Sequence, residues 1–237
     1  MRLDKLLSRL GTASRSGCRD LLRSGRVKVN GVPARDPAMD VPNGAEVLLD
    51  GAPLDTRMDR YLMLHKPAGV LTAKEDRNCK TVLDLLPGAY ASLGCMPVGR
   101  LDKDTTGLLL LTTDGELAHR LLSPARHVDK VYEAEVAGEL TEADVRAFSD
   151  GIPLKDFTAL PAKLEILSPS LARLTVREGK YHQVKRMFGA LGKPVEKLRR
   201  LSFGPLMLDD RLSPGEYREL TDQEIAALYA AAGLTHA

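Results

Sequence analysis

A polar loop that runs directly into four consecutive leucines constrains this chain more than any other stretch of its sequence. Residues 98–107 read Val-Gly-Arg-Leu-Asp-Lys-Asp-Thr-Thr-Gly, and residues 108–111 are all leucine. A short apolar run bounded by turn residues predicts a fully buried strand. The loop is then held at the edge of the core, where a carboxylate is fixed in place and shielded from bulk water.

The residues of this loop, taken alone, leave three interpretations. In the plainest one it is a tight turn, with Asp102 and Asp104 bonding nearby backbone N–H groups and Gly107 supplying an unusual dihedral angle. A calcium loop is excluded, because its twelfth position requires a bidentate glutamate and Thr113 stands there. The third interpretation, membership of a known family, depends on the rest of the chain.

Composition and charge are those of a soluble globular protein with an uneven distribution of cations. The 237 residues, 43% hydrophobic and 28% charged, leave room for one small and one larger domain. The net charge of +2 is uninformative, but residues 1–35 hold nine Lys or Arg against two acidic residues. Such a block is typical of a phosphate-binding surface, and a solvated basic face fits it about equally well.

Several classes of protein are not expected. The three cysteines form no C-x-x-C pair and the five histidines have no zinc spacing, so we expect no disulfide framework and no metal site. No apolar stretch resembles a signal peptide or approaches the roughly 18 residues that span a bilayer. We therefore expect a cytoplasmic, reduced protein with no membrane partner.

Residues 1–56 are predicted to form the small domain. Leucines at 3, 6, 7 and 10 have helical spacing, and a second helix begins at Ser14 or Ser16 and ends at Gly25. Residues 27–29 alternate as a strand, and Asn30-Gly31 is a hairpin turn. The pattern resembles the small RNA-binding domain first described in a ribosomal protein of the small subunit. That resemblance implies an RNA surface made by Arg2, Lys5, Arg15, Arg19, Arg23, Arg26 and Lys28.

Residues 54–60 are the expected linker, and residues 60–237 the larger domain. Strands are predicted at 61–64, 108–111, 130–136, 162–167, 172–176 and 195–208, and a turn is predicted at 214–217. Helices are predicted at 80–86, at 116–122, at 141–148, from about 183 to 192, and from 221 onward. The strands outnumber the helices and do not alternate with them regularly. The fold class is therefore α+β, with a largely antiparallel sheet and flanking helices.

Residues 99–115, Gly-Arg-Leu-Asp-x-Asp-Thr-Thr-Gly-Leu-x-Leu-Leu-Thr-x-Asp-Gly, resemble the signature loop of RNA pseudouridine synthases of the RsuA branch. The Lys-Pro-x-Gly at 66–69 and the Gly-Lys-Tyr-His-Gln-Val-Lys-Arg-Met run at 179–187 resemble the same family. The resemblance thus spans nearly the whole chain, and a match of this length before a predicted strand is specific. It implies a pseudouridine synthase domain after the small basic one.

The resemblance also implies the site residues. Asp102 is the catalytic residue, and Arg100 fills the space of a displaced base or grips a neighbouring phosphate. Tyr132 packs on the target base, although the residues alone favour a surface tyrosine there. A basic residue lies beside the carboxylate: Lys185 by alignment, with Arg186 as the alternative. From 173 to 200 nine basic residues stand against two acidic ones, which suits a groove for RNA backbone.

The implied reaction converts a uridine of ribosomal RNA to pseudouridine without a cofactor. The uridine first leaves its stack, at a cost of a few kcal/mol. Asp102 then acts as a nucleophile or as a general base. Residues 1–5 and 181–188 look most like the small-subunit enzymes, which implies uridine 516 of 16S RNA, naked or in a partly assembled subunit, and a monomeric enzyme. The alternatives are a sister synthase for 23S RNA and a non-catalytic RNA-binding assembly factor.

Overall fold

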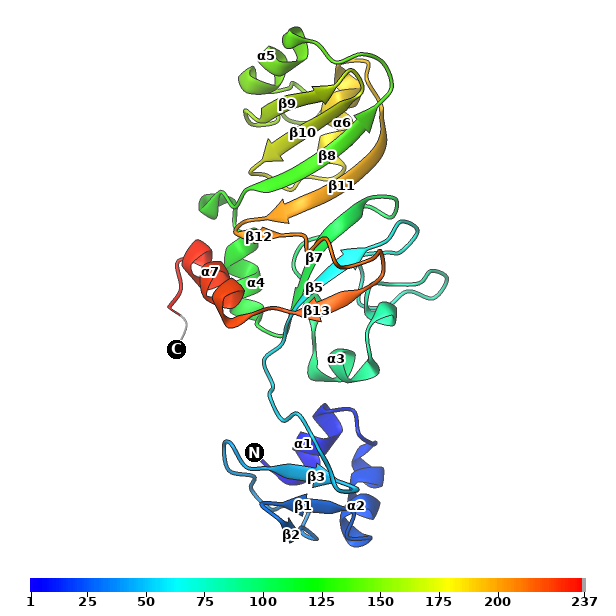
Figure 1. Ribbon diagram of the computed structural model, residues 1–237, viewed down its shortest axis with the longest axis vertical. Coiled ribbons are helices and arrows are strands. Elements are labelled where there is room, and N and C mark those ends of the chain that lie inside the picture. Colours follow the sequence, from blue (N-terminus) through cyan, green and yellow to red (C-terminus); the bar gives the residue numbers. More distant parts are fainter. Residues whose placement is uncertain (236–237) are drawn as a thin grey trace. The chain divides into compact units, whose positions relative to one another are not determined.

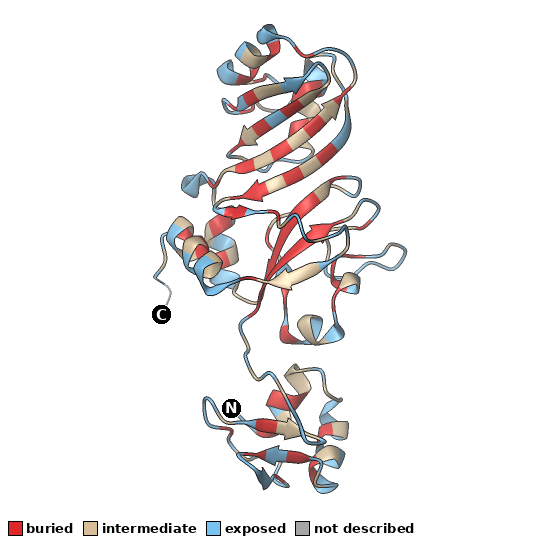
Figure 2. Ribbon diagram, viewed as in Figure 1, coloured by how far each residue is buried: buried red, intermediate tan, exposed pale blue. Residues whose placement is uncertain are grey.

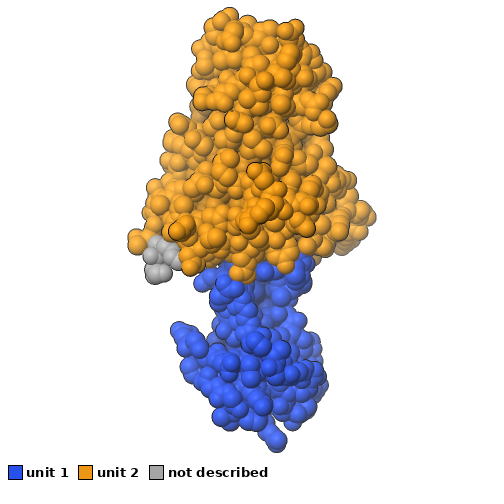
Figure 3. Space-filling view, in the orientation of Figure 1, with its two compact units in different colours: residues 1–60, 86–95 blue, residues 61–85, 96–237 orange. Residues whose placement is uncertain are grey.

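The computed structural model describes residues 1–235, which form two compact units (Figure 3). The first unit comprises residues 1–60 and 86–95, and the second comprises residues 61–85 and those from 96 onward. Each unit combines helices with one sheet, which confirms the α+β class. No sequence pattern had indicated that residues 86–95 belong with the first unit. Residues 236 and 237 of the expected larger domain lie outside the described part.

In the first unit, two helices pack against a small sheet, and a third, short helix contacts the first of them (Figure 1). Its elements are α1 (Leu3–Arg9), α2 (Arg15–Arg23), β1 (Val27–Val29), β2 (Val32–Pro33), β3 (Val47–Leu49), β4 (Ala52–Pro53) and α3 (Gly88–Leu93). The strand order is β2-β1-β3-β4, all antiparallel. Ser14, not Ser16, caps α2 by accepting a hydrogen bond from the Gly17 N–H. Asn30 and Gly31 form the predicted turn, with φ of 49° and 79°.

The second unit is built on a nine-stranded sheet in the order β13-β5-β7-β11-β8-β10-β9, with β6 paired to β7 and β12 to β11. The strands are β5 (Tyr61–Lys66), β6 (Met96–Pro97), β7 (Thr106–Thr112), β8 (Lys130–Val136), β9 (Lys163–Ser168), β10 (Leu171–Val176), β11 (Val195–Phe203), β12 (Leu206–Met207) and β13 (Tyr217–Glu219). Only β7 and β11 pair in parallel among these strands. The largely antiparallel sheet is confirmed.

Burial divides this sheet into two halves (Figure 2). Strands β5 and β7 are buried along nearly their whole length, as four consecutive leucines require. Strand β8 instead alternates, with Lys130, Tyr132, Ala134 and Val136 buried and Val131 half-buried. The surface position that the residues alone favour for Tyr132 is therefore wrong: its ring is only 8% exposed.

Four helices flank the sheet: α4 (Gly115–Leu122), α5 (Glu142–Asp150), α6 (Gln183–Ala190) and α7 (Asp222–Ala232). In Figure 1, α4 and α7 lie beside the half that contains β5, β7 and β12, and α5 and α6 lie beside the half that contains β8, β9 and β10. Thr141 and Thr221 cap α5 and α7 as predicted. No helix within residues 1–235 is long and apolar enough to cross a membrane.

Three element predictions require correction. The helix expected at 80–86 is a single 3-10 turn, η1 (Leu83–Leu85). Pro87 ends that turn and also caps the N-terminus of α3, because a proline ring is tolerated where a helix starts. The strand expected at 195–208 divides into β11 and β12 at Gly204, and Tyr217 opens a further edge strand, β13, rather than ending a turn. A 3-10 turn, η2 (Pro124–Arg126), follows α4.

Candidate active site

The loop that carries Asp102 is held by a buried lysine at the end of β5. The Lys66 side chain is fully buried, and its ammonium donates to the backbone carbonyls of Pro67 at 3.0 Å, Lys103 at 3.2 Å and Thr105 at 2.8 Å. Burial lowers the pKa of Lys66 from 10.5 to about 8. Two carbonyls of the loop, on either side of residue 104, are therefore fixed to the core.

A second tether holds the other side of Asp102. The Thr72 hydroxyl donates to the Leu101 carbonyl at 2.8 Å and accepts from the Leu101 N–H at 3.1 Å. The Gly69 N–H donates to the Lys103 carbonyl at 2.8 Å. The residues before and after Asp102 are thus both anchored, and so the direction of its carboxylate is fixed.

Gly107 ends the loop where two strands approach each other closely. Its φ of +103° confirms the predicted unusual dihedral, and a Cβ there would lie 2.2 Å from the Arg200 carbonyl oxygen. The Arg200 guanidinium in turn donates to the Leu108 carbonyl at 2.8 Å. Only glycine permits this contact between β7 and β11, which fixes the loop against the centre of the sheet.

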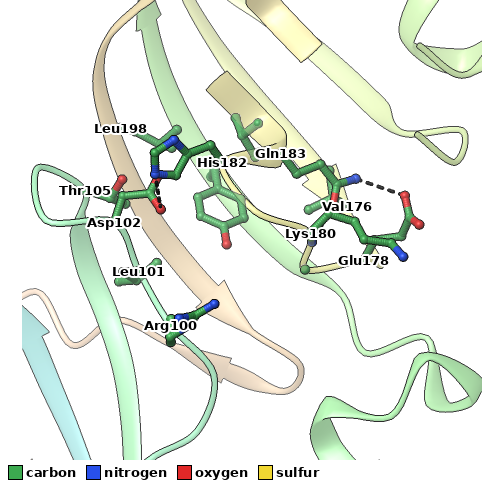
Figure 4. A pocket seen from close by; sticks show the side chains of 13 residues that line it. Arg100, Leu101, Asp102, Thr105, Val176, Glu178, Lys180, His182, Gln183 and Leu198 are labelled. Atoms are coloured by element: carbon green, nitrogen blue, oxygen red, sulfur yellow. Dashed lines mark hydrogen bonds and ion pairs between the residues drawn. The ribbon is translucent and has the colours of Figure 1, made fainter. Parts of the chain in front are cut away.

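Two side chains from a distant segment face the Asp102 carboxylate. The Nε2 atom of His182 lies 3.6 Å from Oδ1 (Figure 4). On the other side of the carboxylate, Nζ of Lys185 lies 3.7 Å from Oδ2. Lys185 also pairs with Asp104, which holds the pKa of Asp104 below its usual range. Arg186 instead pairs with Asp156. Of the two basic residues considered from the sequence, Lys185 is therefore the one beside Asp102.

This geometry decides against a simple turn. A turn-forming aspartate directs its carboxylate to the N–H groups of its own loop. The carboxylate of Asp102 is directed across to His182 and Lys185, from a segment some 80 residues later, and makes no backbone hydrogen bond among the described residues. The loop is built to present this carboxylate to a cleft.

The cleft is open, with a volume of about 430 Å³ that includes space continuous with solvent. We call residues 100–105 its loop wall and residues 178–185, at the start of α6, its helix wall. It is lined by Arg100, Leu101, Asp102, Thr105, Tyr132, Val176, Glu178, Gly179, Lys180, His182, Gln183, Val184 and Leu198. Figure 4 shows Asp102 and His182 facing each other across it, with Arg100 on the same side as Leu101.

Polar groups without partners line this cleft. Arg100 is exposed and forms no ion pair with any of residues 1–235. The Thr105 hydroxyl is 1% exposed and has no hydrogen-bond partner in the described chain. Unsatisfied buried polar groups are uncommon, and in a cleft they are available to a ligand. Tyr132 adds an aromatic ring to the same cleft.

Of the residues singled out from the sequence, Arg100, Asp102 and Tyr132 line this cleft, and Lys185 lies beside the Asp102 carboxylate. Arg186 lies in an ion pair with Asp156, away from Asp102. Sequence reasoning did not assign Lys66, Thr72 or His182. His182 has one local signal, a φ of 48°, which is uncommon for a residue other than glycine. This angle cannot be read from the sequence.

The seven basic residues expected to contact RNA lie in the first unit. All seven are exposed. Arg15, Arg19 and Arg23 recur every four residues and so share one face of α2. Arg2, Arg23 and Arg26 are engaged by Asp4, Asp20 and Asp50, respectively. Lys5, Arg15, Arg19 and Lys28 form no ion pair within residues 1–235, which leaves these four cations available to phosphates.

Residues 60–190 match the family model described as RNA pseudouridylate synthase, and residues 1–47 match the S4 domain. The "Uncharacterized RNA pseudouridine synthase YtzG" of Bacillus subtilis (strain 168) is 46% identical over 96% of this chain and 98% of its own length. The "Ribosomal small subunit pseudouridine synthase A" of Escherichia coli (strain K12) is 41% identical over 96% and 100%.

The protein of the same name from Yersinia pestis is 43% identical over 97% of this chain and 99% of its own. A solved structure titled "Crystal structure of pseudouridylate synthase" superimposes with a TM-score of 0.69 at 38% identity, over 96% of this chain and 99% of that one. These similarities extend over both units and include the loop wall and the helix wall.

Proposed function

The chain belongs to the RNA pseudouridylate synthase family, and we propose that it converts one uridine of small-subunit ribosomal RNA to pseudouridine, with Asp102 as the catalytic carboxylate. The observation that carries the proposal is the anchored Asp102 carboxylate, which faces a cleft and has His182 and Lys185 within 4 Å. In this reaction the glycosidic bond to N1 of uracil breaks, the base turns, and C5 bonds to the ribose. The hydrogen on C5 leaves as a proton and N1 takes up a proton, so the product is an isomer of uridine and no electrons are gained or lost.

The residues of the cleft divide this work. Asp102 acts on the ribose, as a nucleophile or as a base for a ribose proton, and both routes require the ionised carboxylate. Lys185 supplies a cation that stabilises this ionised form in a partly desolvated site. Tyr132 packs on the uracil ring, and Arg100 grips the neighbouring phosphate or fills the space left by the displaced base.

Ribosomal RNA is supported as the substrate by the S4 domain and by the relatives. Proteins named for the ribosomal small subunit are 41–43% identical to this chain over nearly their whole length. We therefore propose 16S RNA as the substrate and uridine 516 as the position. We further propose that the enzyme is a monomer and acts in the cytoplasm.

The test incubates purified protein with 16S or 23S RNA transcripts, or with partly assembled small subunits, and maps pseudouridine by carbodiimide-dependent primer-extension stops. We expect a single new stop, at uridine 516 of small-subunit RNA, that is absent with Asp102→Asn. A stop in 23S RNA instead would retain the chemistry and overturn the target. No stop with any substrate would overturn the proposed enzymatic activity and favour a non-catalytic RNA-binding assembly factor.

A further inference from the structure

An exposed tyrosine stands next to the cleft, stacked on one of the two residues that face Asp102. The rings of Tyr181 and His182 have centroids 3.8 Å apart and planes inclined by 17°. Tyr181 is 70% exposed, although aromatic rings are usually at least partly buried. One face of its ring covers the imidazole, and the exposed remainder of the side chain is open to solvent.

Hydrogen bonds of the buried Gln183 side chain and of Glu178 hold the segment that carries this ring. Gln183 is 5% exposed; its side-chain oxygen accepts from the Lys180 N–H, and its side-chain nitrogen donates to Glu178, each at 3.0 Å. The same Glu178 oxygen accepts from the Leu160 N–H at 2.9 Å. Tyr181 therefore lies in an ordered segment, and little conformational entropy remains to be lost when a ligand stacks on it.

Tyr181 lies where it could contact a nucleotide adjacent to the target uridine. His182 lies between it and Asp102, with Nε2 only 3.6 Å from the carboxylate. Lys180 lines the cleft, and its ammonium lies over the Phe157 ring. Lys180 forms no ion pair within 4 Å among the described residues, since Asp156 nearby pairs with Arg186. An exposed ring beside an unpaired cation is the arrangement that binds unpaired nucleotides by stacking and phosphate contact.

We propose that the open face of Tyr181 is a stacking platform for an RNA base adjacent to the target uridine. This inference rests on the proposed function. The base must be unpaired when it stacks, because a duplex leaves no face of an internal base free. Tyr181 then holds the strand beside the flipped uridine, while Tyr132 and Asp102 act on the uridine itself.

Stacking on a neighbouring base binds the ground state and the transition state alike. Loss of the ring is therefore expected to raise KM and Kd with little change in kcat. A stacked base is typically associated with a 5- to 100-fold difference in affinity, roughly, when the aromatic residue is replaced by alanine. If Tyr181 only held His182 in place against Asp102, its loss would instead lower kcat and leave Kd unchanged.

The test uses a short RNA that contains the mapped target uridine, with 2-aminopurine or an abasic ribose placed in turn at each flanking nucleotide. Binding is measured with Asp102→Asn alone and combined with Tyr181→Ala or Tyr181→Phe, and turnover with otherwise wild-type protein. Met207→Ala, which removes another exposed apolar side chain of the second unit, is the matched control.

We expect quenching of 2-aminopurine at one flanking position, lost with Tyr181→Ala and retained with Tyr181→Phe and Met207→Ala. An abasic ribose at that position is expected to weaken binding as much as Tyr181→Ala does, and the two changes together no further. Unchanged quenching and Kd with Tyr181→Ala, in an enzyme that still forms pseudouridine, would overturn the inference alone. Absence of pseudouridine with the wild-type protein would overturn the proposed function.

Discussion

The two walls of the cleft differ in how they are held and in what they present. The loop wall is fixed through its backbone, because Lys66 and Thr72 bind the carbonyls of Leu101, Lys103 and Thr105. The helix wall is fixed by side chains of its own segment, chiefly Glu178 and Gln183, and it presents cations and an exposed ring. One wall positions a single carboxylate, and the other surrounds it.

This difference predicts separate functional effects. Changes that move or remove the Asp102 carboxylate of the loop wall should alter the chemical step. In the helix wall, changes at Lys185 should alter the chemical step, and changes at Tyr181 should alter RNA binding. Changes in the first unit should alter binding alone. The predictions below test this division, beginning with the largest expected effect.

Asp102→Asn is expected to lower kcat by at least about 1,000-fold while the RNA Kd stays within a few-fold, because the amide can neither attack nor take a proton. The matched control is Asp104→Asn. Asp104 is 72% exposed and does not line the cleft, so its loss should change kcat by less than about 3-fold. Single-turnover kinetics separates the two variants. Equal losses of kcat in the two variants would show that activity depends on the total negative charge of the loop and not on the Asp102 carboxylate alone.

Lys185→Met is expected to lower kcat about 10- to 100-fold, since it removes the cation 3.7 Å from Asp102. Arg186→Met, which removes the neighbouring cation paired with Asp156, should change kcat by less than about 3-fold. Steady-state kinetics on one RNA substrate measures both. A larger loss with Arg186→Met would reverse the assignment that the geometry supports.

Lys66→Met should weaken both the fold and the catalytic step. Three carbonyls lose their buried donor, which costs about 1–3 kcal/mol of unfolding free energy, or roughly 2–10 °C in Tm. We expect kcat to fall about 10-fold, because the loop is no longer anchored after Asp102. Lys103→Met removes an exposed neighbouring lysine and should change neither quantity. Calorimetry and kinetics on both variants test this. A Lys66→Met variant with the Tm and kcat of the wild-type protein would show that Lys66 does not anchor the loop.

The same lysine predicts a pH dependence with opposite signs for activity and stability. The folded-state pKa of Lys66 is about 8, below the ordinary 10.5. Above pH 8 the ammonium loses a proton, and with it one donor to the loop, so kcat should decline. Between pH 8 and 10.5 the unfolded chain binds more protons at this residue, so unfolding free energy should rise relative to Lys66→Met.

Lys130→Met is the control for this profile, because burial also lowers the pKa of Lys130 to about 8 while its ammonium donates to Val128, outside the loop wall. The decline of kcat above pH 8 should persist in Lys130→Met and be absent from Lys66→Met. Persistence in both variants would assign the decline to another group.

The smallest effects are expected in the first unit. Replacing Lys5, Arg15, Arg19 or Lys28 by Gln should weaken RNA binding a few-fold each, reduce the salt dependence of log Kd by about 0.7–0.9 per contact, and leave kcat unchanged. Arg26→Gln, whose cation already pairs with Asp50, should weaken binding less. Titrations at several salt concentrations measure this. A fall in kcat with any of them would mean that this surface also serves the chemical step.

Local patterns predicted the parts of the fold that depend on local physics. Four leucines became a buried strand, Asn30-Gly31 became a hairpin turn, and Thr141 and Thr221 capped helices. Pro87 was misread because a proline after an apolar stretch can stop one element and begin the next. The β13 edge strand was missed because three half-buried residues carry too little periodicity.

The candidate site was predictable where it follows a contiguous motif, as at Asp102, and not where it depends on contacts distant in sequence. Lys66 binds carbonyls 37 and 39 residues away, and a lysine in a sequence is expected at the surface. The residues of the strand alone favoured a surface position for Tyr132, whereas the resemblance placed it at the target base; the sheet buries its side of β8. His182 reaches Asp102 only through its left-handed backbone and the fold of α6.

The most direct measurement of the central claim is release of tritium from ribosomal RNA that carries [5-³H]uridine, with no added cofactor. When C5 of uracil bonds to the ribose, its hydrogen leaves, so each conversion releases the label at that position. Wild-type protein should release the label of one uridine per small-subunit RNA and Asp102→Asn none, although both bind the RNA. Release that persists in Asp102→Asn, or no release by the wild-type protein from free or partly assembled RNA, would contradict the account.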